Sequence, residues 1–144
     1  MSPEKTKILQ ERYPKIFGLK EDSKEPYGLY GLECGDGWFD LIDTLCKNIQ
    51  HHIDWKIERI PEEEREGFQV VATQIKQKFS TLRFYYNGGD DYTSGLIQMA
   101  EAMSGTICES CGDKASVRTK GWMTNLCNAC NIKQFFKEKD FDLK

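Results

Sequence analysis

The sequence lacks the long apolar runs that membrane proteins carry. No uncharged stretch among its 144 residues approaches the roughly 18 apolar residues that a membrane-spanning helix needs. The first residues, from Met1 to Lys5, include no apolar segment of the kind that a secretory signal requires. These absences predict a cytoplasmic protein with no membrane partner.

Familiar enzyme signatures are also missing. The sequence has no Walker phosphate-binding loop, no HExxH motif, no Gly-x-Ser-x-Gly turn and no dinucleotide-binding fingerprint. A Mg²⁺ site in a metal-dependent hydrolase or nuclease is conceivable from the carboxylates Asp36, Asp40, Asp90 and Asp91. Helix capping explains each of these residues without a metal, so the sequence favours a protein that is not an enzyme.

A strong excess of basic charge is absent as well. The formal net charge is −3; residues 104–144 hold seven basic and five acidic side chains, and residues 1–103 hold 13 and 18. Proteins that neutralise phosphates usually carry a clustered basic face, so a nucleic-acid partner is disfavoured. The +2 tail still offers Arg118, Lys120, Lys133 and Lys137 as nucleic-acid contacts in an alternative interpretation.

Cysteine is the residue that is present in an informative pattern. Cys108 and Cys111 form one Cys-x-x-Cys pair, and Cys127 and Cys130 form a second pair after 15 intervening residues. Two such pairs can place four thiolates around one ion, and a hairpin of that length can bring them together. The spacing predicts a structural Zn²⁺ site; because the protein fills all four positions, none is left for a catalytic water.

The remaining cysteines and the two histidines carry no ligand-like spacing. Cys34 and Cys46 are separated by 11 residues, and Cys46 falls on the apolar side of a predicted helix, where it is expected to be buried. His51 and His52 are neighbours, whose side chains on a helix point about 100° apart. We expect these four residues to form no second metal site.

Hydrophobic periodicity predicts an α+β fold, with helices packed on a small antiparallel hairpin or sheet. Residues 1–104 are expected to form the body, with helices at 3–13, 37–57 and 90–104 and strands at 68–78 and 81–87; residues 105–144 form the zinc-binding module. Ser2, followed by Pro3, is expected to start the first helix, Asp36 to cap the second, and Asp90 or Asp91 to cap the third.

Several apolar side chains are assigned to the core by their spacing. The second helix carries an apolar face made of Trp38, Leu41, Ile42, Leu45, Ile49 and Ile53. The first strand alternates at Val71, Thr73, Ile75 and Phe79, and the third helix is expected to bury Leu96, Ile97, Ala100 and Met103. In the module, Trp122, Leu126, Ile132, Phe135 and Phe136 are expected to form an apolar cover against the body.

The second cysteine pair, with its flanking residues 126–130 (Leu-Cys-Asn-Ala-Cys), resembles the corresponding pair of GATA-type zinc fingers. The resemblance covers Cys108 to about Phe136 and implies a treble-clef-like build, in which a knuckle, a β-hairpin and a helix follow one another. It carries the zinc ligands over to the four cysteines. It does not carry over DNA reading, because the arm between the pairs is shorter, a tryptophan–arginine–arginine stretch is missing, and Asn131-Ile132 replaces glycine–leucine.

Three segments together resemble a group of small uncharacterised proteins encoded by bacteriophages and prophages. They are residues 30–42 (Tyr-Gly-Leu-Glu-Cys-Gly-Asp-Gly-Trp-Phe-Asp-Leu-Ile), residues 82–86 (Leu-Arg-Phe-Tyr-Tyr) and the two cysteine pairs. The resemblance implies an accessory phage protein without an assigned activity. Together with the acidic charge and the missing enzyme motifs, it predicts a non-enzymatic, zinc-stabilised binding protein that acts in the host cytoplasm, by inhibiting a host defence protein or sequestering its small signalling molecule. The oligomeric state, and whether Tyr27 to Trp38 form a binding surface or part of the core, stay open.

Overall fold

The computed structural model describes residues 1–18 and 31–142 and has the α+β fold that the sequence predicts. Four α-helices, five short or medium strands and two 3₁₀ helices follow one another in the described residues. In chain order they are α1 (Pro3–Arg12), β1 (Leu32–Glu33), η1 (Asp36–Trp38), α2 (Phe39–Ile57), η2 (Glu62–Glu64), β2 (Val71–Lys78), β3 (Thr81–Asn87), α3 (Asp91–Ser104), β4 (Val117–Arg118), β5 (Asn125–Leu126) and α4 (Asn128–Asp142).

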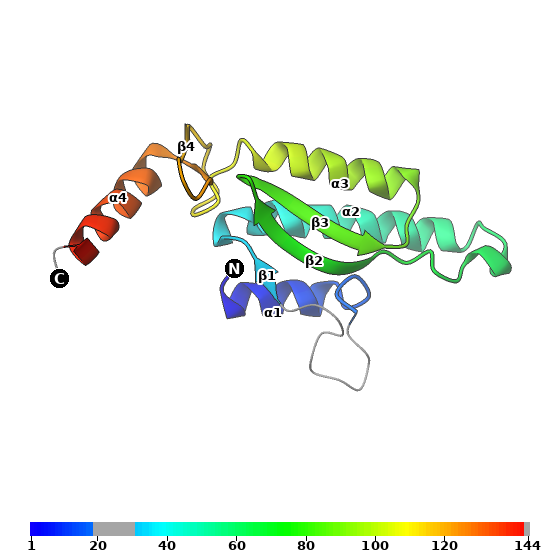
Figure 1. Ribbon diagram of the computed structural model, residues 1–144. Coiled ribbons are helices and arrows are strands. Elements are labelled where there is room, and N and C mark those ends of the chain that lie inside the picture. Colours follow the sequence, from blue (N-terminus) through cyan, green and yellow to red (C-terminus); the bar gives the residue numbers. More distant parts are fainter. Residues whose placement is uncertain (19–30, 143–144) are drawn as a thin grey trace.

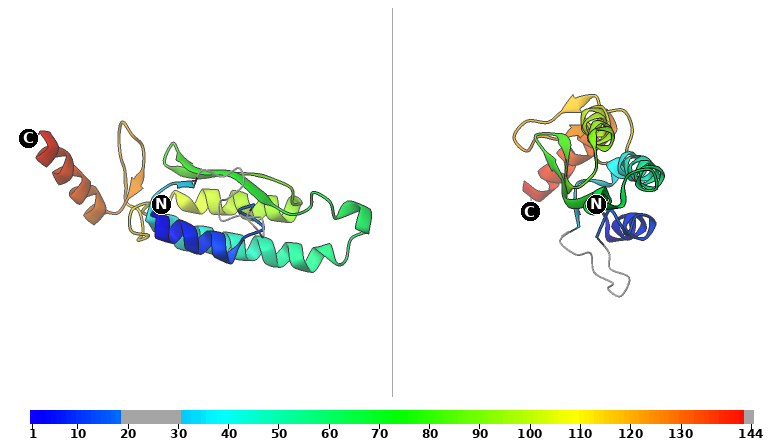
Figure 2. Two further views of the ribbon diagram at one scale, coloured as in Figure 1. Left: turned by 90° about the horizontal axis from the view of Figure 1, so that it is seen from below. Right: turned by 90° about the vertical axis from the view of Figure 1, so that its right-hand side faces the viewer.

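The body has two layers, a three-stranded sheet and the helices α1, α2 and α3 on one side of it (Figure 2). Strands β2 and β3 form the expected antiparallel hairpin, and β1 pairs with β2 in parallel, with Leu32 opposite Ile75. Sequence reasoning missed β1, because two residues are too few to show an alternating pattern. Residues 19–30 lie outside the described residues, so of the segment from Tyr27 to Trp38 only residues 31–38 are described.

Two of the predicted helix starts are confirmed and one is wrong. The Ser2 side chain caps α1 by accepting from the Lys5 backbone N–H, and Asp90 and Thr93 form a reciprocal capping box at the start of α3. Asp36 does not cap α2. It lies at the start of η1, where its carboxylate accepts from the Ser2 backbone N–H at 2.7 Å and so fixes the N-terminus to this loop.

The core of the body is built around α2, as its periodicity predicts. Trp38, Ile42, Leu45, Ile49 and Ile53 are all buried, while Leu41 is partly buried against them. Cys46 is also fully buried on this face, where burial raises the pKa of its thiol. Cys34 is buried at the end of β1, and burial raises the pKa of its thiol to about 12. Both thiols therefore stay protonated and serve as packing groups.

The expected alternation along β2 is wrong, because the strand contains a β-bulge. The register shifts between Ala72 and Gln74, so Ala72 and Ile75, three residues apart, both face the core. Thr73 is exposed, and Phe79 is 60% exposed in the turn after the strand. A bulge adds one residue to one strand, so a simple period of two assigns the wrong face on one side of it.

Helix α3 buries Ile97 and Ala100, as predicted, but Met103 is 48% exposed. Ser104 takes the buried place at the end of the helix, and its hydroxyl accepts from the Leu82 backbone N–H at 2.8 Å. The hydroxyl thereby links the helix to β3 and prevents a buried N–H group from being left unpaired.

Residues 105–142 lie at one end of the body, next to the turn that joins β2 and β3, and α4 projects away from the sheet (Figure 1). A two-stranded antiparallel ribbon, β4 with β5, stands between the body and α4. Among the described residues, no helix combines the length and the apolar character that crossing a bilayer demands.

Candidate metal centre

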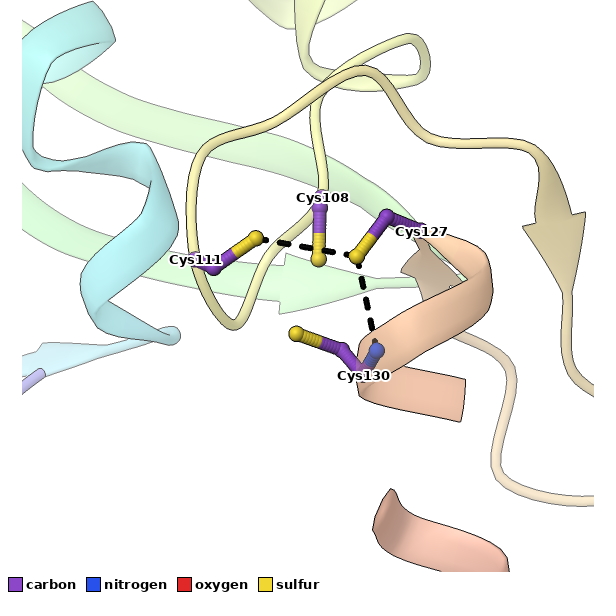
Figure 3. A group of neighbouring side chains, drawn as sticks. All are labelled: Cys108, Cys111, Cys127 and Cys130. Atoms are coloured by element: carbon purple, nitrogen blue, oxygen red, sulfur yellow. Dashed lines mark hydrogen bonds between the residues drawn. The ribbon is translucent and has the colours of Figure 1, made fainter. Parts of the chain in front are cut away.

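The four cysteines of the two Cys-x-x-Cys pairs converge at the junction of the body and α4 (Figure 3). Their sulfur atoms all lie within 4.8 Å of one another, and Cys111 Sγ lies 3.7 Å from Cys127 Sγ. All four thiols are free, since a disulfide would require about 2.05 Å between sulfurs. They are the only group of three or more clustered metal-binding side chains in the described residues.

The first pair lies on a tight turn that directs both sulfurs inward. The Cys108 backbone N–H donates to the Asp113 carbonyl at 2.7 Å, and the Gly112 N–H donates to the Cys108 carbonyl at 2.9 Å. Gly112 has φ +88°, a left-handed conformation that glycine adopts without strain. The Asp113 N–H points at Cys111 Sγ from 3.5 Å, which is favourable when that sulfur is a thiolate.

The second pair is placed by the start of α4. Cys127 directly precedes the helix, and Cys130 lies in its first turn, so both side chains point back toward the first pair (Figure 3). The Cys130 backbone N–H lies 3.4 Å from Cys127 Sγ and can donate to it. The order of knuckle, hairpin and helix is the one that a treble-clef-like module has.

The thiols influence one another strongly. Burial by itself would raise the pKa of Cys108, but backbone N–H groups of Cys127, Cys111 and Ser110 lower it to about 7. The Asp113 N–H lowers the pKa of Cys111, but the neighbouring sulfurs raise it, to about 12. Partial burial raises the pKa of Cys130. Cys108 therefore ionises more readily than Cys111 or Cys130, and a cation among the sulfurs would favour their thiolate forms.

The first knuckle docks on the loop that precedes α2. Trp38, the largest fully buried side chain, donates from its indole N–H to the Ile107 carbonyl at 3.1 Å, and the Gly37 N–H donates to the Glu109 carbonyl at 2.8 Å. The approach is so close that a Cβ atom on Gly37 would lie 2.1 Å from the Cys108 carbonyl oxygen. The knuckle therefore contacts the body backbone to backbone.

Glu109 lies between the two cysteines of the first pair and joins three segments. One carboxylate oxygen accepts from the Gly35 backbone N–H at 3.0 Å, and the other accepts from the Thr124 hydroxyl. Its own N–H donates to the Asn125 carbonyl at 3.0 Å. Glu109 thus connects the loop before α2, the first knuckle and β5.

The arm between the knuckles is fixed to the turn between β2 and β3. The buried Asn125 side chain donates to the Ser80 carbonyl at 2.7 Å, and the Gln77 amide donates to the Met123 carbonyl. Leu126 is buried, as predicted. Polar contacts therefore carry most of this attachment.

The predicted apolar cover is otherwise wrong. Trp122 is 80% exposed, and three side chains of α4 are more than half exposed: Ile132, Phe135 and Phe136. The helix projects away from the body (Figure 1). Phe135 shares a groove with the β4–β5 ribbon, and Ile132 and Phe136 share one with Leu126, but these side chains do not form a buried cover against the body.

The four basic residues assigned to the nucleic-acid alternative do not form a single cluster. Arg118 and Lys120 line a groove between the β4–β5 ribbon and α4. Lys133 and Lys137 line a different groove, with Cys130 and Phe136. The helix thus separates the predicted contacts into two pairs.

Asp90 and His52 of the body have structural partners. Asp90 caps α3 and lies 2.8 Å from His52 Nε2, and the His52 ring stacks on Tyr92 with 4.1 Å between ring centroids. Asp40 is exposed in the first turn of α2. Among the described residues these groups form no metal-binding cluster.

Sequence reasoning missed Gly35, Gly37, Glu109 and Asn125, which attach the centre to the body. Their contacts join residues that are 45 to 74 positions apart, and no local pattern encodes such pairings. The one available signal is the Cys-Gly-Asp-Gly sequence at 34–37, since closely spaced glycines often allow two backbones to approach.

No protein-family model, curated protein or solved structure matches this chain.

Proposed function

We propose that the chain is a zinc-stabilised binding protein without catalytic activity, in which a closed tetrathiolate centre holds the C-terminal module in place. The observation that carries the proposal is the convergence of four free sulfurs within 4.8 Å. Zn–S bonds of about 2.3 Å place the sulfurs of a regular tetrahedron about 3.8 Å apart, close to the 3.7 Å between Cys111 and Cys127.

The donor set supports zinc over other ions and a structural role over a catalytic one. Thiolates are soft ligands that suit Zn²⁺, whereas Mg²⁺ and Ca²⁺ prefer oxygen. Zn²⁺ would also stabilise the thiolate forms of Cys111 and Cys130, whose pKa values are raised without a metal. Because the protein supplies all four ligands, the metal has no open position for water or substrate.

A binding role is supported by what the module leaves exposed. Its ribbon and helix present Trp122, Ile132, Phe135 and Phe136 to solvent on a fixed scaffold. Exposed aromatic side chains on a rigid element are typical of binding surfaces. Cytoplasmic location and action on a phage host stay predictions that rest on the sequence alone.

Native mass spectrometry of the tag-free chain, purified without added metal, tests the proposal. The expected result is one zinc ion per chain in the wild type and none in Cys111→Ser. Cys34→Ser is the matched control, because its thiol lies outside the cluster; it is expected to retain one zinc. A metal-free wild-type chain, or a Cys111→Ser variant that retains stoichiometric zinc, would contradict the assignment.

A further inference from the structure

Three aromatic rings from three separate elements are exposed around the arm of the zinc module. Phe79, in the turn after β2, is 60% exposed; Trp122, in the β4–β5 arm, is 80% exposed; and Phe135, on α4, is 51% exposed. Phe79 and Trp122 line one groove, and Trp122 and Phe135 line a second. Trp122 is therefore common to the two grooves, one toward the β2–β3 turn and the other toward α4.

This surface is basic in a chain whose net charge is negative. Lys78 belongs to the first groove, Arg118 and Lys120 to the second, and the second also contains one acid, Glu138. Lys78 lies over the Phe79 ring at 5.6 Å, and Lys139 lies over the Phe135 ring at 4.7 Å. We call this set the Trp122 surface; it consists of Lys78, Phe79, Arg118, Lys120, Trp122 and Phe135.

The backbone at the exposed Phe79 is strained. Phe79 and Ser80 have φ +52° and +67°, and these are the only non-glycine residues with positive φ in the described residues. Two-residue turns of this type favour Asn-Gly, and a bulky aromatic residue in the left-handed region is costly. Such strain is commonly retained where the side chain has a function.

The arm that carries Trp122 is attached to the turn that carries Phe79. Asn125 donates to the Ser80 carbonyl within the strained turn, and Gln77 donates to the Met123 carbonyl next to Trp122. The rings of Phe79 and Trp122 are therefore positioned by hydrogen bonds between the body and the module. A ligand that spans both grooves meets a preformed surface, which lowers the ordering cost of binding.

We propose that the Trp122 surface binds single-stranded nucleic acid, with bases stacked on Phe79, Trp122 and Phe135 and phosphates near Lys78, Arg118 and Lys120. A single strand carries a series of flat rings along a series of negative charges, and these are the two features that exposed aromatic and basic side chains bind. A duplex hides the faces of its bases, and an acidic peptide carries charge without repeated rings. This inference rests on the proposed function, because the zinc centre positions the arm that carries Trp122.

The measurement is fluorescence anisotropy of labelled 12-nucleotide single strands, DNA and RNA of mixed sequence, titrated with the zinc-loaded full chain. Binding to single strands and much weaker binding to the matched duplex are expected. Three phosphate contacts predict a loss of affinity of about 20-fold between 50 and 200 mM salt. Quenching of Trp122 fluorescence on binding reports stacking directly, and it is expected to disappear in Trp122→Ala.

Trp122→Ala is expected to weaken binding about 5- to 150-fold, the range seen when one stacking ring is removed. Trp55→Ala is the matched control: Trp55 is 51% exposed at the far end of α2 and also carries an arginine, Arg59, at 4.4 Å from its ring. Its removal is expected to leave affinity unchanged. Lys120→Glu is expected to weaken binding and lower the salt dependence, whereas the exposed Lys47→Glu on α2 is not.

Phe79→Asn separates a binding role from a structural one. Asparagine accepts the left-handed conformation more readily, so this variant is expected to melt at an equal or higher temperature. It also removes a ring, so it is expected to bind single strands more weakly. A variant that is more stable but binds worse supports the proposal, and unchanged affinity contradicts it.

The two proposals fail in different ways. A chain that holds one zinc but binds no single strand at 50 mM salt, binds duplex equally well, or is insensitive to Trp122→Ala overturns the nucleic-acid inference and leaves the zinc centre intact. Loss of a protein partner on Trp122→Ala without nucleic-acid binding likewise overturns it. A chain that binds no zinc contradicts the proposed function itself.

Discussion

The body and the zinc module differ in what holds them together. The body has a hydrophobic core that extends from Leu9 to Ala100. Beyond residue 104, the buried apolar side chains are Cys108 and Leu126 alone among the described residues, beside the buried polar Thr124 and Asn125. The body can be stabilised by burial of apolar area, whereas the module is too small for that and needs another source of stability.

The junction between the two regions shows that they are not independent. The first knuckle contacts Gly35, Gly37 and Trp38, and the arm contacts the turn at Ser80. The carbonyl that accepts from the Trp38 indole belongs to Ile107, the residue directly before Cys108. Disorder in the module therefore reaches the core. Metal binding is thus expected to stabilise the loop before α2 as well as the module.

Removal of zinc gives the largest expected effect. Structural zinc sites in finger peptides contribute about 10 kcal/mol or more to folding, so chelation or Cys111→Ser is expected to unfold residues 106–142. Hydrogen exchange measured residue by residue is expected to show lost protection there and reduced protection at Gly35 to Trp38. Protection of α2 around Ile49 is expected to persist. An unchanged exchange pattern in residues 106–142 would show that the module does not depend on the metal.

A core substitution in the body is expected to give the complementary result. Ile49 is fully buried on α2, and Ile49→Ala is expected to lower the free energy of unfolding by about 2–5 kcal/mol. Chemical denaturation measures this change, and native mass spectrometry is expected to show zinc still bound. Loss of zinc at low denaturant in this variant would contradict the distinction between the two sources of stability.

Gly37→Ala acts on the junction itself. The new methyl group would lie 2.1 Å from the Cys108 carbonyl oxygen, so the knuckle must shift, at a cost of about 1–3 kcal/mol. Gly95→Ala is the control: nothing lies within 4 Å of its Cβ position on α3, and alanine in a helix is expected to stabilise by about 0.5–1 kcal/mol. Thermal melting of both variants checks that the first substitution lowers the melting temperature and the second raises it. Equal melting temperatures would mean that the knuckle does not rest on this loop.

The charge on Asp90 is expected to give the smallest effect, and it acts within the body. Partial burial raises the pKa of Asp90, but hydrogen bonds from His52 and Thr93 outweigh this effect and lower the pKa below its ordinary value of 3.8. A lowered folded-state pKa contributes stability above the unfolded pKa, and that stability is lost as the pH falls through the folded value. Asp90→Asn keeps a good helix cap but removes the charge, so stability is expected to fall less steeply below pH 3.8. If the stability of the wild type and of Asp90→Asn fell equally steeply with falling pH, this role would be contradicted.

The features that the sequence predicts well are those encoded locally. The spacing of apolar residues on α2, the Ser2 and Asp90 caps and the two cysteine pairs all depend on neighbours within a few residues. The errors arise from contacts across the chain. Asp36 pairs with the N-terminus instead of capping α2, and the bulge in β2 changes which residues face the core.

The module shows the same limit more clearly. The sequence predicts which cysteines converge, because a ligand set needs only spacing. It does not predict that Trp122 and Phe135 stay exposed, since apolar side chains beside a metal site look the same whether they cover a core or form a surface. Only the direction in which α4 leaves the body distinguishes the two (Figure 1).

The most direct test of the account is the zinc K-edge X-ray absorption spectrum of the tag-free chain as purified. A closed tetrathiolate centre predicts a first shell of four sulfur scatterers at about 2.3 Å and no nitrogen or oxygen. The absence of a zinc edge, or a shell that includes oxygen or nitrogen, would contradict the claim that the four cysteines close a structural metal site.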